Sequence, residues 1–218
     1  MGKNTDNRTL RLRSGVTLTK VTAIRNVLKW AQQGNTKGCG FYIAAYNICE
    51  DMAQRYSVPV HVVAGVIAAL SPQTPWDSNV RLAESYFAGR QLKGIPAIRV
   101  YKCNEILRAD MERVADILNG PKTVAFYWNI LGDSERVTID THATYSCFYG
   151  PDIEVRHGEF FTPFKSGNPK AAQYRFLESV YKVAARKAGL EPSTLQARVW
   201  AAVRDRKGRN EHRVEVPF

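Results

Sequence analysis

The chain has 218 residues, of which 44% are hydrophobic, so it is long and apolar enough to bury a sizeable core. This composition excludes a chain that is disordered throughout. The formal net charge of +11 and the pI near 9.6 favour a polyanionic partner, nucleic acid before an anionic membrane surface. The alternative is ordinary solubilising charge.

The positive charge is concentrated at the two ends of the chain. Residues 1–40 hold eight Lys and Arg against one acidic residue, residues 41–150 hold ten against eleven, and residues 151–218 hold thirteen against eight. We expect a single domain made of a basic N-terminal arm (1–15), a core (16–150), C-terminal helices (151–204) and a basic tail (205–218).

The four cysteines, Cys39, Cys49, Cys103 and Cys147, form no CxxC pair and no spacing typical of zinc or iron–sulfur ligation. We therefore expect reduced core thiols in a cytoplasmic protein, with no metal and no cofactor. The longest apolar run, residues 58–70, is too short to span a bilayer, and the N-terminus lacks the apolar segment of a signal peptide.

Helical periodicity dominates the chain. Apolar residues recur at three- and four-residue steps over 41–56, which predicts a core helix, and 60–70 is apolar nearly all round, which predicts a buried central helix containing a satisfied His61. Further helices are expected at 98–108, 111–118, 123–131, 141–149, 169–188 and 192–204. Only 136–140 is expected to be extended, and 150–168 is the longest irregular connection.

The sequence "SPQTPW" ends the central helix, because the residue before a proline avoids the α region. Thr74 is the expected N-cap of the next helix, with Pro75 in its first turn and Asp77 three residues after the cap. Gln73 is thus expected in a rigid corner of two or three residues. Its side chain either serves a function there or satisfies backbone groups of the turn.

The tetrapeptide Asn119-Gly120-Pro121-Lys122 joins two predicted helices. A tight turn followed by the free N–H groups of a helix N-terminus makes a small anion site, suited to a nucleic-acid phosphate. An ordinary turn between two antiparallel helices is the alternative.

Asp140 lies between the short extended segment and the next predicted helix, in "VTIDTHATYSC". An aspartate at this place is commonly an N-cap. His142, two residues later, is either a second polar group of a site or a plain helix residue.

The last predicted helix places Gln196, Trp200 and Arg204 on one face at four-residue steps. This face either packs inside the protein or closes over a substrate. Trp76 is a core candidate whose closeness to Gln73 also makes it a candidate for stacking on a base.

Together, "AALSPQTPWDSN", "LNGPKT" and "VTIDTH" resemble the helix-hairpin-helix DNA glycosylase superfamily, in the family's order, over residues 58–150. The resemblance implies an all-α, two-lobed helical bundle with a cleft between the lobes. The segments "GPKTVAFYWNI" and "LQARVW" are more similar to a phage-encoded branch that includes the α-glutamyl/putrescinyl thymine pyrophosphorylases, which would place the protein in the cytoplasm of a bacterial host.

The resemblance also implies roles for the candidate residues. Gln73 would wedge into the duplex where a base is extruded, and Asp140 would act at the sugar of the extruded nucleotide. The hairpin, with Asn119, Gly120, Lys122 and Thr123, would grip the DNA backbone. Lys122 would be either a Schiff-base amine or a phosphate ligand.

The chain departs from the family pattern in two respects. The hairpin has the single glycine Gly120 and loses one N–H donor at Pro121, so its grip on DNA is made differently or is weaker. The four-cysteine cluster of many members is absent.

Three functions remain open on the sequence. The first is a DNA glycosylase that flips a modified or damaged base and cleaves its N-glycosidic bond. The second is a transferase that attaches an amine or amino acid co-substrate to an activated hydroxymethyl-uracil in DNA, releasing pyrophosphate. The third is a DNA-binding protein without catalysis, whose affinity falls as salt rises.

Overall fold

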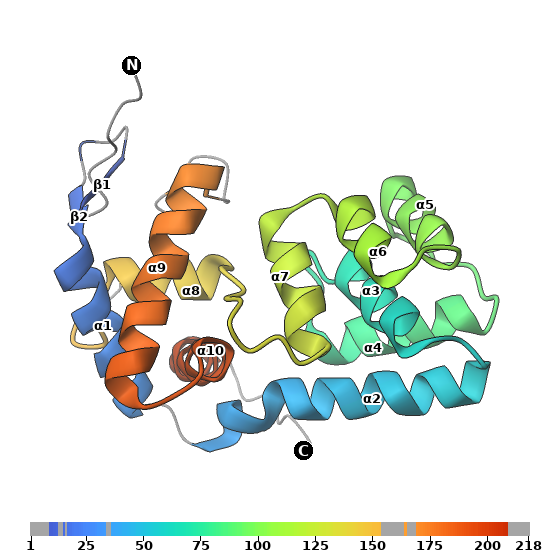
Figure 1. The fold of residues 1–218 in the computed structure, drawn as a ribbon, viewed down its shortest axis with the longest axis horizontal. Helices are drawn as coiled ribbons and strands as arrows, with labels where there is room; N and C mark the ends of the chain where they lie inside the picture. The colour runs from blue at the N-terminus through green and yellow to red at the C-terminus, as the bar shows by residue number, and fades with distance from the viewer. Residues whose placement is uncertain are drawn as a thin grey trace. The chain divides into compact units, whose positions relative to one another are not determined.

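The computed structural model describes residues 9–12, 15, 17–33, 36–153, 164 and 169–208, and ten α-helices make up nearly all regular structure there (Figure 1). The all-α prediction is confirmed for this part of the chain. The chain divides into two compact units, each with its own hydrophobic core. We call residues 42–133 the central unit, and residues 1–41 with 134–218 the discontinuous unit.

The central unit contains six helices, the first of which begins at Phe41, one residue before the unit itself. They are α2 (Phe41–Tyr56), α3 (Val60–Leu70), α4 (Trp76–Phe87), α5 (Ala97–Ile106), α6 (Met111–Leu118) and α7 (Pro121–Ile130). The predictions for α2, α3 and α6 are confirmed to the residue, and those for α5 and α7 to within two residues at each end.

Helix α3 is enclosed by its neighbours, as its sequence predicts. It contacts α4, α5, α6 and α7, and every residue from Val62 to Leu70 is buried (Figure 1). A helix without a polar face has no side that water can solvate well, so the surrounding helices must cover all of it. His61, at its first turn, has its expected partner, because Nε2 lies 3.1 Å from the carbonyl oxygen of Ala109.

The expected N-cap role of Thr74 is wrong. Helix α4 begins at Trp76, and its N-cap is Pro75, whose extended backbone has φ −58° and ψ 149°. The Thr74 hydroxyl instead donates to the carbonyl oxygens of Leu70 at 2.9 Å and Pro72 at 3.2 Å. The last carbonyls of α3 lack helical partners, and this demand outweighs capping of the next helix.

The discontinuous unit contains α1 (Lys20–Gln33), α8 (Thr141–Phe148), α9 (Ala171–Ala188), α10 (Pro192–Gly208), the 3₁₀ helix η1 (Thr36–Gly40) and a hairpin of β1 (Thr9–Arg11) and β2 (Thr17–Thr19). The antiparallel hairpin pairs Leu10 with Leu18, and both leucines are buried. The sequence did not predict it, because three-residue strands are too short to show alternation.

Residues 136–140 form neither helix nor strand. One other expectation needs correction in this unit. Helix α10 runs four residues past the expected end at 204, into the expected tail 205–218. Residues 1–8 of the expected arm and 209–218 of the tail lie outside the described residues. The connection 150–168 is described only at 150–153 and 164, where it forms neither helix nor strand.

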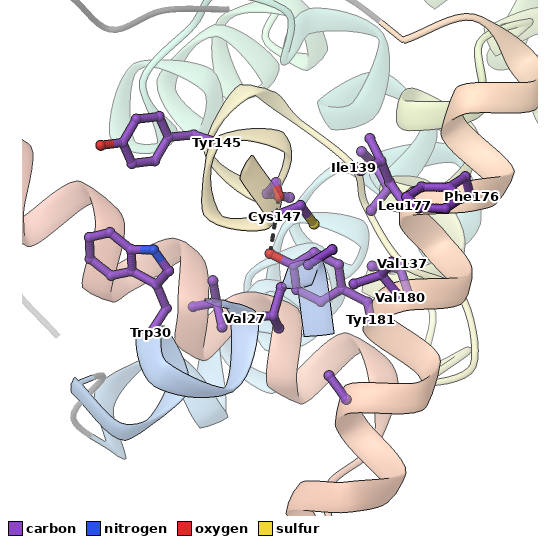
Figure 2. Packing of buried hydrophobic residues seen from close by; sticks show 14 of the residues in the cluster. Val27, Trp30, Val137, Ile139, Tyr145, Cys147, Phe176, Leu177, Val180 and Tyr181 are labelled. Atoms are coloured by element: carbon purple, nitrogen blue, oxygen red, sulfur yellow. Dashed lines mark hydrogen bonds between the residues drawn. The ribbon is translucent and has the colours of Figure 1, made fainter. Parts of the chain in front are cut away.

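The core of the discontinuous unit lies among α1, α8, α9 and α10. Figure 2 shows Val27 and Trp30 on α1, and Val180 and Tyr181 on α9, pointing into it. Although the Tyr181 side chain is buried, its hydroxyl has a partner, because it lies 2.7 Å from the hydroxyl of Ser146 on α8. A buried polar group that has a partner fixes its neighbours without the cost of an unmade hydrogen bond.

Helix α8 is held at its C-terminal end by α1. Asn26 Nδ2 donates to the carbonyl oxygen of Cys147 at 3.1 Å, and Trp30 Nε1 donates to that of Tyr149 at 2.7 Å. These bonds satisfy carbonyls that have no partner within the helix. The opposite end of α8, where Asp140 lies, is thereby attached to an anchored element.

We predict that Gly65→Ala destabilises the protein by up to about 2 kcal/mol. A Cβ on Gly65 would lie 2.8 Å from Cγ1 of Val114 and 2.9 Å from Cγ2 of Ile106, both fully buried. Overpacking costs about 1–3 kcal/mol, which outweighs the roughly 1 kcal/mol of helix propensity that alanine gains over glycine. Urea unfolding measures the difference. Gly40→Ala is the control, since a Cβ there meets nothing within 4 Å; equal stability of Gly65→Ala and wild type would contradict the prediction.

Candidate functional site

The Gln73 corner, residues 71–74 between α3 and α4, is closed by several local hydrogen bonds. Ser71 Oγ donates to the carbonyl oxygen of Ala68 at 2.9 Å, and the backbone N–H of Thr74 donates to that of Ser71 at 3.1 Å. Together with the Thr74 hydroxyl on Leu70, these bonds fix the chain on both sides of Gln73. The corner is thus held by its own hydrogen bonds.

Gln73 itself has a left-handed backbone, with φ +58°. This region is uncommon for residues other than glycine, asparagine and aspartate. The Gln73 side chain is exposed and makes no hydrogen bond to any residue that the structure describes. The alternative that it satisfies backbone groups of the turn therefore has no support in this part of the chain.

Helix α5 contacts both the Gln73 corner and the α6–α7 hairpin through side chains. Arg99 Nη1 donates to the carbonyl oxygen of Pro72 at 2.7 Å, and Lys102 Nζ donates to that of Leu118 at 2.6 Å. The two cations are three residues apart and so lie one turn apart on the same face of α5. One helix therefore ties the Gln73 corner and the α6–α7 hairpin to a common support.

The turn of the α6–α7 hairpin consists of two residues, Asn119 and Gly120. Asn119 ends α6 in the left-handed region, with φ 49°, and Gly120 is the N-cap of α7 with an extended backbone. Asparagine tolerates the left-handed region better than most residues, which explains its place there. The Thr123 hydroxyl donates to the carbonyl oxygen of Gly120 at 3.0 Å and closes the turn.

The first turn of α7 has the features of an anion site. No side chain caps it, and Pro121 occupies its first position, so the N–H groups of Lys122 and Thr123 face the helix N-terminus. The Lys122 ammonium is partly exposed and makes no ion pair with the described residues. This turn can bind a phosphate oxygen through backbone and side-chain donors together.

Asp140 is the N-cap of α8, as the sequence predicts. One carboxylate oxygen, Oδ1, accepts the backbone N–H of Ala143 at 2.7 Å. The other, Oδ2, lies 3.5 Å from Nδ1 of His142. The Asp140 side chain is 14% exposed and that of His142 is 22% exposed, so both reach solvent from a mostly enclosed position.

The segment that leads to Asp140 is fixed by a buried tyrosine of α9. The Tyr174 hydroxyl donates to the carbonyl oxygen of Val137 at 2.7 Å and accepts the N–H of Ile139 at 3.2 Å. Burial raises the pKa of Tyr174 well above its ordinary value, so this hydroxyl keeps its proton at neutral pH. A single side chain thus holds the backbone of this segment through two hydrogen bonds.

On α10 the three candidates have different surroundings. Gln196 is only 3% exposed and belongs to the interior. Trp200 is half-buried, with the His142 ring at 6.0 Å and the Phe41 ring at 5.9 Å. The Arg204 guanidinium lies 4.6 Å over the Trp200 ring. Asp140, His142, Trp200 and Arg204 are therefore linked by successive contacts within the discontinuous unit.

The aromatic candidates of the central unit are core residues in the main. Trp76 is half-buried and packs edge-on against Phe126, with ring centroids 6.3 Å apart. Tyr127 is fully buried and donates its hydroxyl to the carbonyl oxygen of Met111. Neither ring is presented as an open stacking surface.

Cys49, Cys103 and Cys147 are buried core residues, and Cys39 is partly buried. Burial raises the pKa of the Cys49 and Cys103 thiols to about 12, so both remain protonated at neutral pH. Among the described residues, no group of His, Cys, Asp and Glu side chains could hold a metal ion. In that same part of the chain, no helix is both long and apolar enough to cross a membrane.

Arg99 and Lys102 were not predicted as site residues from the sequence. Each is an ordinary basic residue on a predicted helix, and its partner is a backbone carbonyl 27 or 16 residues away along the chain. Finding them requires the fold.

Fold and site together define a predominantly α-helical protein with a braced corner, an uncapped hairpin helix and a half-buried carboxylate. The chain belongs to a family of unknown function, DUF7178, whose match covers residues 8–207. No curated protein and no solved structure matches the chain.

We predict that Arg99→Met loosens the Gln73 corner. The lost bond joins a charged donor to a half-buried carbonyl and contributes about 1–2 kcal/mol, so the Thr74 amide should exchange roughly 5- to 30-fold faster. Hydrogen exchange followed by NMR measures this directly. Arg108→Met is the control, because Arg108 is exposed and follows the same helix. Equal Thr74 exchange in both variants would contradict the bracing role.

Proposed function

We propose that the protein acts on DNA as a glycosylase of the helix-hairpin-helix type, extruding a modified or damaged base and cleaving its N-glycosidic bond. The observation that carries this proposal is the Gln73 corner. A glutamine with φ +58° is held rigidly, exposed and without a hydrogen bond to the described residues. Strained and braced exposed side chains are typical of functional sites.

The corner suits a wedge for physical reasons. Extruding a base costs a few kcal/mol of unstacking, which a side chain inserted into the gap can offset. A wedge that is already ordered in the free protein loses little further conformational entropy on insertion. The bonds of Ser71 and Thr74 and the Arg99 brace provide that order in advance.

The hairpin of α6 and α7 supports DNA as the substrate. The uncapped first turn of α7 and the Lys122 ammonium supply donors for the phosphate backbone. Pro121 removes one N–H donor. The Lys122 ammonium can compensate, because its three N–H donors can rotate to reach a phosphate in any orientation. We assign Asn119, Gly120, Lys122 and Thr123 to backbone contacts in this proposal.

Asp140 would carry the chemistry. As the C1′–N bond breaks, its electrons leave with the base, and positive charge develops on the sugar. A carboxylate beside the sugar stabilises that charge and accepts a proton from the water that attacks C1′. The bond from Ala143 N–H to Oδ1 orients the carboxylate, and Oδ2 lies next to His142.

We predict that Asp140→Asn loses base release by at least about 100-fold, the usual contribution of a general base. Asparagine is as good an N-cap as aspartate, so the melting temperature should change little. Asp140→Ala is the matched control for the cap, since it should lose both activity and about 1 kcal/mol of stability. Intact mass of oligonucleotides carrying damaged bases, hydroxymethyl-uracil or its pyrophosphorylated form measures the reaction.

Each outcome of that experiment is informative. Loss of one base, absent in Asp140→Asn, supports the glycosylase. Gain of an amine with loss of pyrophosphate, in mixtures containing glycine, glutamate or putrescine, would replace it with the transferase. DNA that is bound but unchanged by the wild type would leave a binding protein and remove the chemical role of Asp140.

We predict opposite effects of Gln73→Gly on stability and function. Glycine relieves the left-handed strain, so the free energy of unfolding should rise by about 0.5–1 kcal/mol. Without the wedge, base extrusion should fall, as seen in the fluorescence of 2-aminopurine placed opposite an abasic-site analogue. Gln73→Asn is the control, because asparagine keeps a polar side chain and tolerates φ > 0. Unchanged extrusion in Gln73→Gly would refute the wedge.

A further inference from the structure

Arg204 is placed in an unusual way for a charged residue. Its guanidinium lies 4.6 Å over the Trp200 ring, and among the described residues it makes no hydrogen bond or ion pair. Asp205 is adjacent in sequence, but neighbouring residues on a helix do not face each other. Stacking on an aromatic ring fixes a guanidinium while leaving its N–H donors directed outward from the ring edge.

The element that carries Arg204 is rigid. Helix α10 contacts α1, α8, α9 and η1. Its own residues Leu195, Val199 and Val203 are buried. Its approach to η1 is so close that a Cβ on Gly38 would lie 2.6 Å from Cα of Arg198. Phe41 packs on the Trp200 ring at 5.9 Å, so the platform under Arg204 is held as well.

The neighbourhood of Arg204 leads directly to the candidate catalytic carboxylate. The His142 ring contacts Trp200 at 6.0 Å, and His142 Nδ1 lies 3.5 Å from Oδ2 of Asp140. A guanidinium and a carboxylate are therefore joined through one indole and one imidazole. This arrangement places opposite charges at the two ends of a short aromatic bridge.

We infer that Arg204, stacked on Trp200, is a binding site for a phosphate group beside the position at which Asp140 acts. A nucleotide matches this pattern of charge, because its anionic phosphate is next to a sugar that becomes cationic when the glycosidic bond breaks. Planar guanidinium donors match two phosphate oxygens at once. The statement that this phosphate belongs to DNA rests on the proposed function. The statement that Arg204 binds a phosphate group does not.

Salt dependence of DNA binding tests the inference. The probe is a fluorescein-labelled duplex with one abasic-site analogue, and anisotropy gives the Kd between about 50 and 200 mM salt. Each phosphate contact adds about 0.9 to the slope of log K against log salt, so the wild type should lose about 3- to 4-fold more affinity over this range than Arg204→Gln. Arg204→Lys should fall between the two, since it keeps the charge without the planar fork.

Arg186→Gln is the matched control, because Arg186 is an exposed residue of the same unit, at the end of α9. It should keep the wild-type slope. Thermal melting by circular dichroism verifies that every variant is folded. A wild-type slope in Arg204→Gln, with the protein folded and DNA bound, would overturn the inference.

Inorganic pyrophosphate separates the phosphate site from the DNA substrate. Trp200 reports on its binding, as the part of the tryptophan fluorescence change that disappears in Trp200→Phe. If the wild type does not bind the duplex, the proposed function fails; a pyrophosphate response that Arg204→Gln lacks would then still support a phosphate site. Absence of both responses would overturn the site as well.

Discussion

The enclosure of α3 is the constraint on which the central unit depends. This helix has no polar face, so α4, α5, α6 and α7 must all pack against it, and each connection between them must turn at its surface. Its C-terminal carbonyls are taken by side chains that come later in the chain: Asn79 binds that of Ile67, Ser71 that of Ala68 and Thr74 that of Leu70. The Gln73 corner is thus a consequence of ending a buried helix without exposing its carbonyls.

The discontinuous unit solves a similar problem from both ends of α8. Asn26 and Trp30 satisfy carbonyls at its C-terminal end, while the Asp140 carboxylate accepts the N–H of Ala143 at the start. One oxygen of this carboxylate caps the helix, and the other lies beside His142. The helix cap and the chemistry that we propose therefore use the same Asp140 carboxylate.

Much of the helical pattern follows from the sequence alone. The ends of α2, α3 and α6 agree with the prediction because their apolar periodicity is bounded by strong signals, such as Pro72 after α3 and Asp110 as the N-cap of α6. Thr74 failed as a predicted cap for a different reason. Its hydroxyl had two possible partners, and only the three-dimensional position of the Leu70 carbonyl decides between them.

The sequence identifies the candidate residues of the site but not the residues that hold them in place. Gln73, Lys122 and Asp140 stand out by sequence, since each lies at a turn or helix start. Arg99 and Lys102, which brace those turns from α5, do not, because a bond to a backbone carbonyl leaves no trace in the identity of its partner. Arg204 differs from these two, because its four-residue step from Trp200 was visible in the sequence, and the structure adds that the guanidinium lies over that ring.

Backbone strain gives the most economical argument for function. Among the described residues, Ser57, Gln73 and Asn119 have positive φ without being glycine. Ser57 follows the end of α2, and Asn119 ends α6 with a residue that tolerates this region. Glutamine has no such tolerance, and a glycine at position 73 would relieve roughly 1 kcal/mol of strain without disturbing any contact that the structure describes. The left-handed backbone of Gln73 is therefore not explained by any contact of its side chain with the described residues, and it is the observation on which the proposed wedge depends.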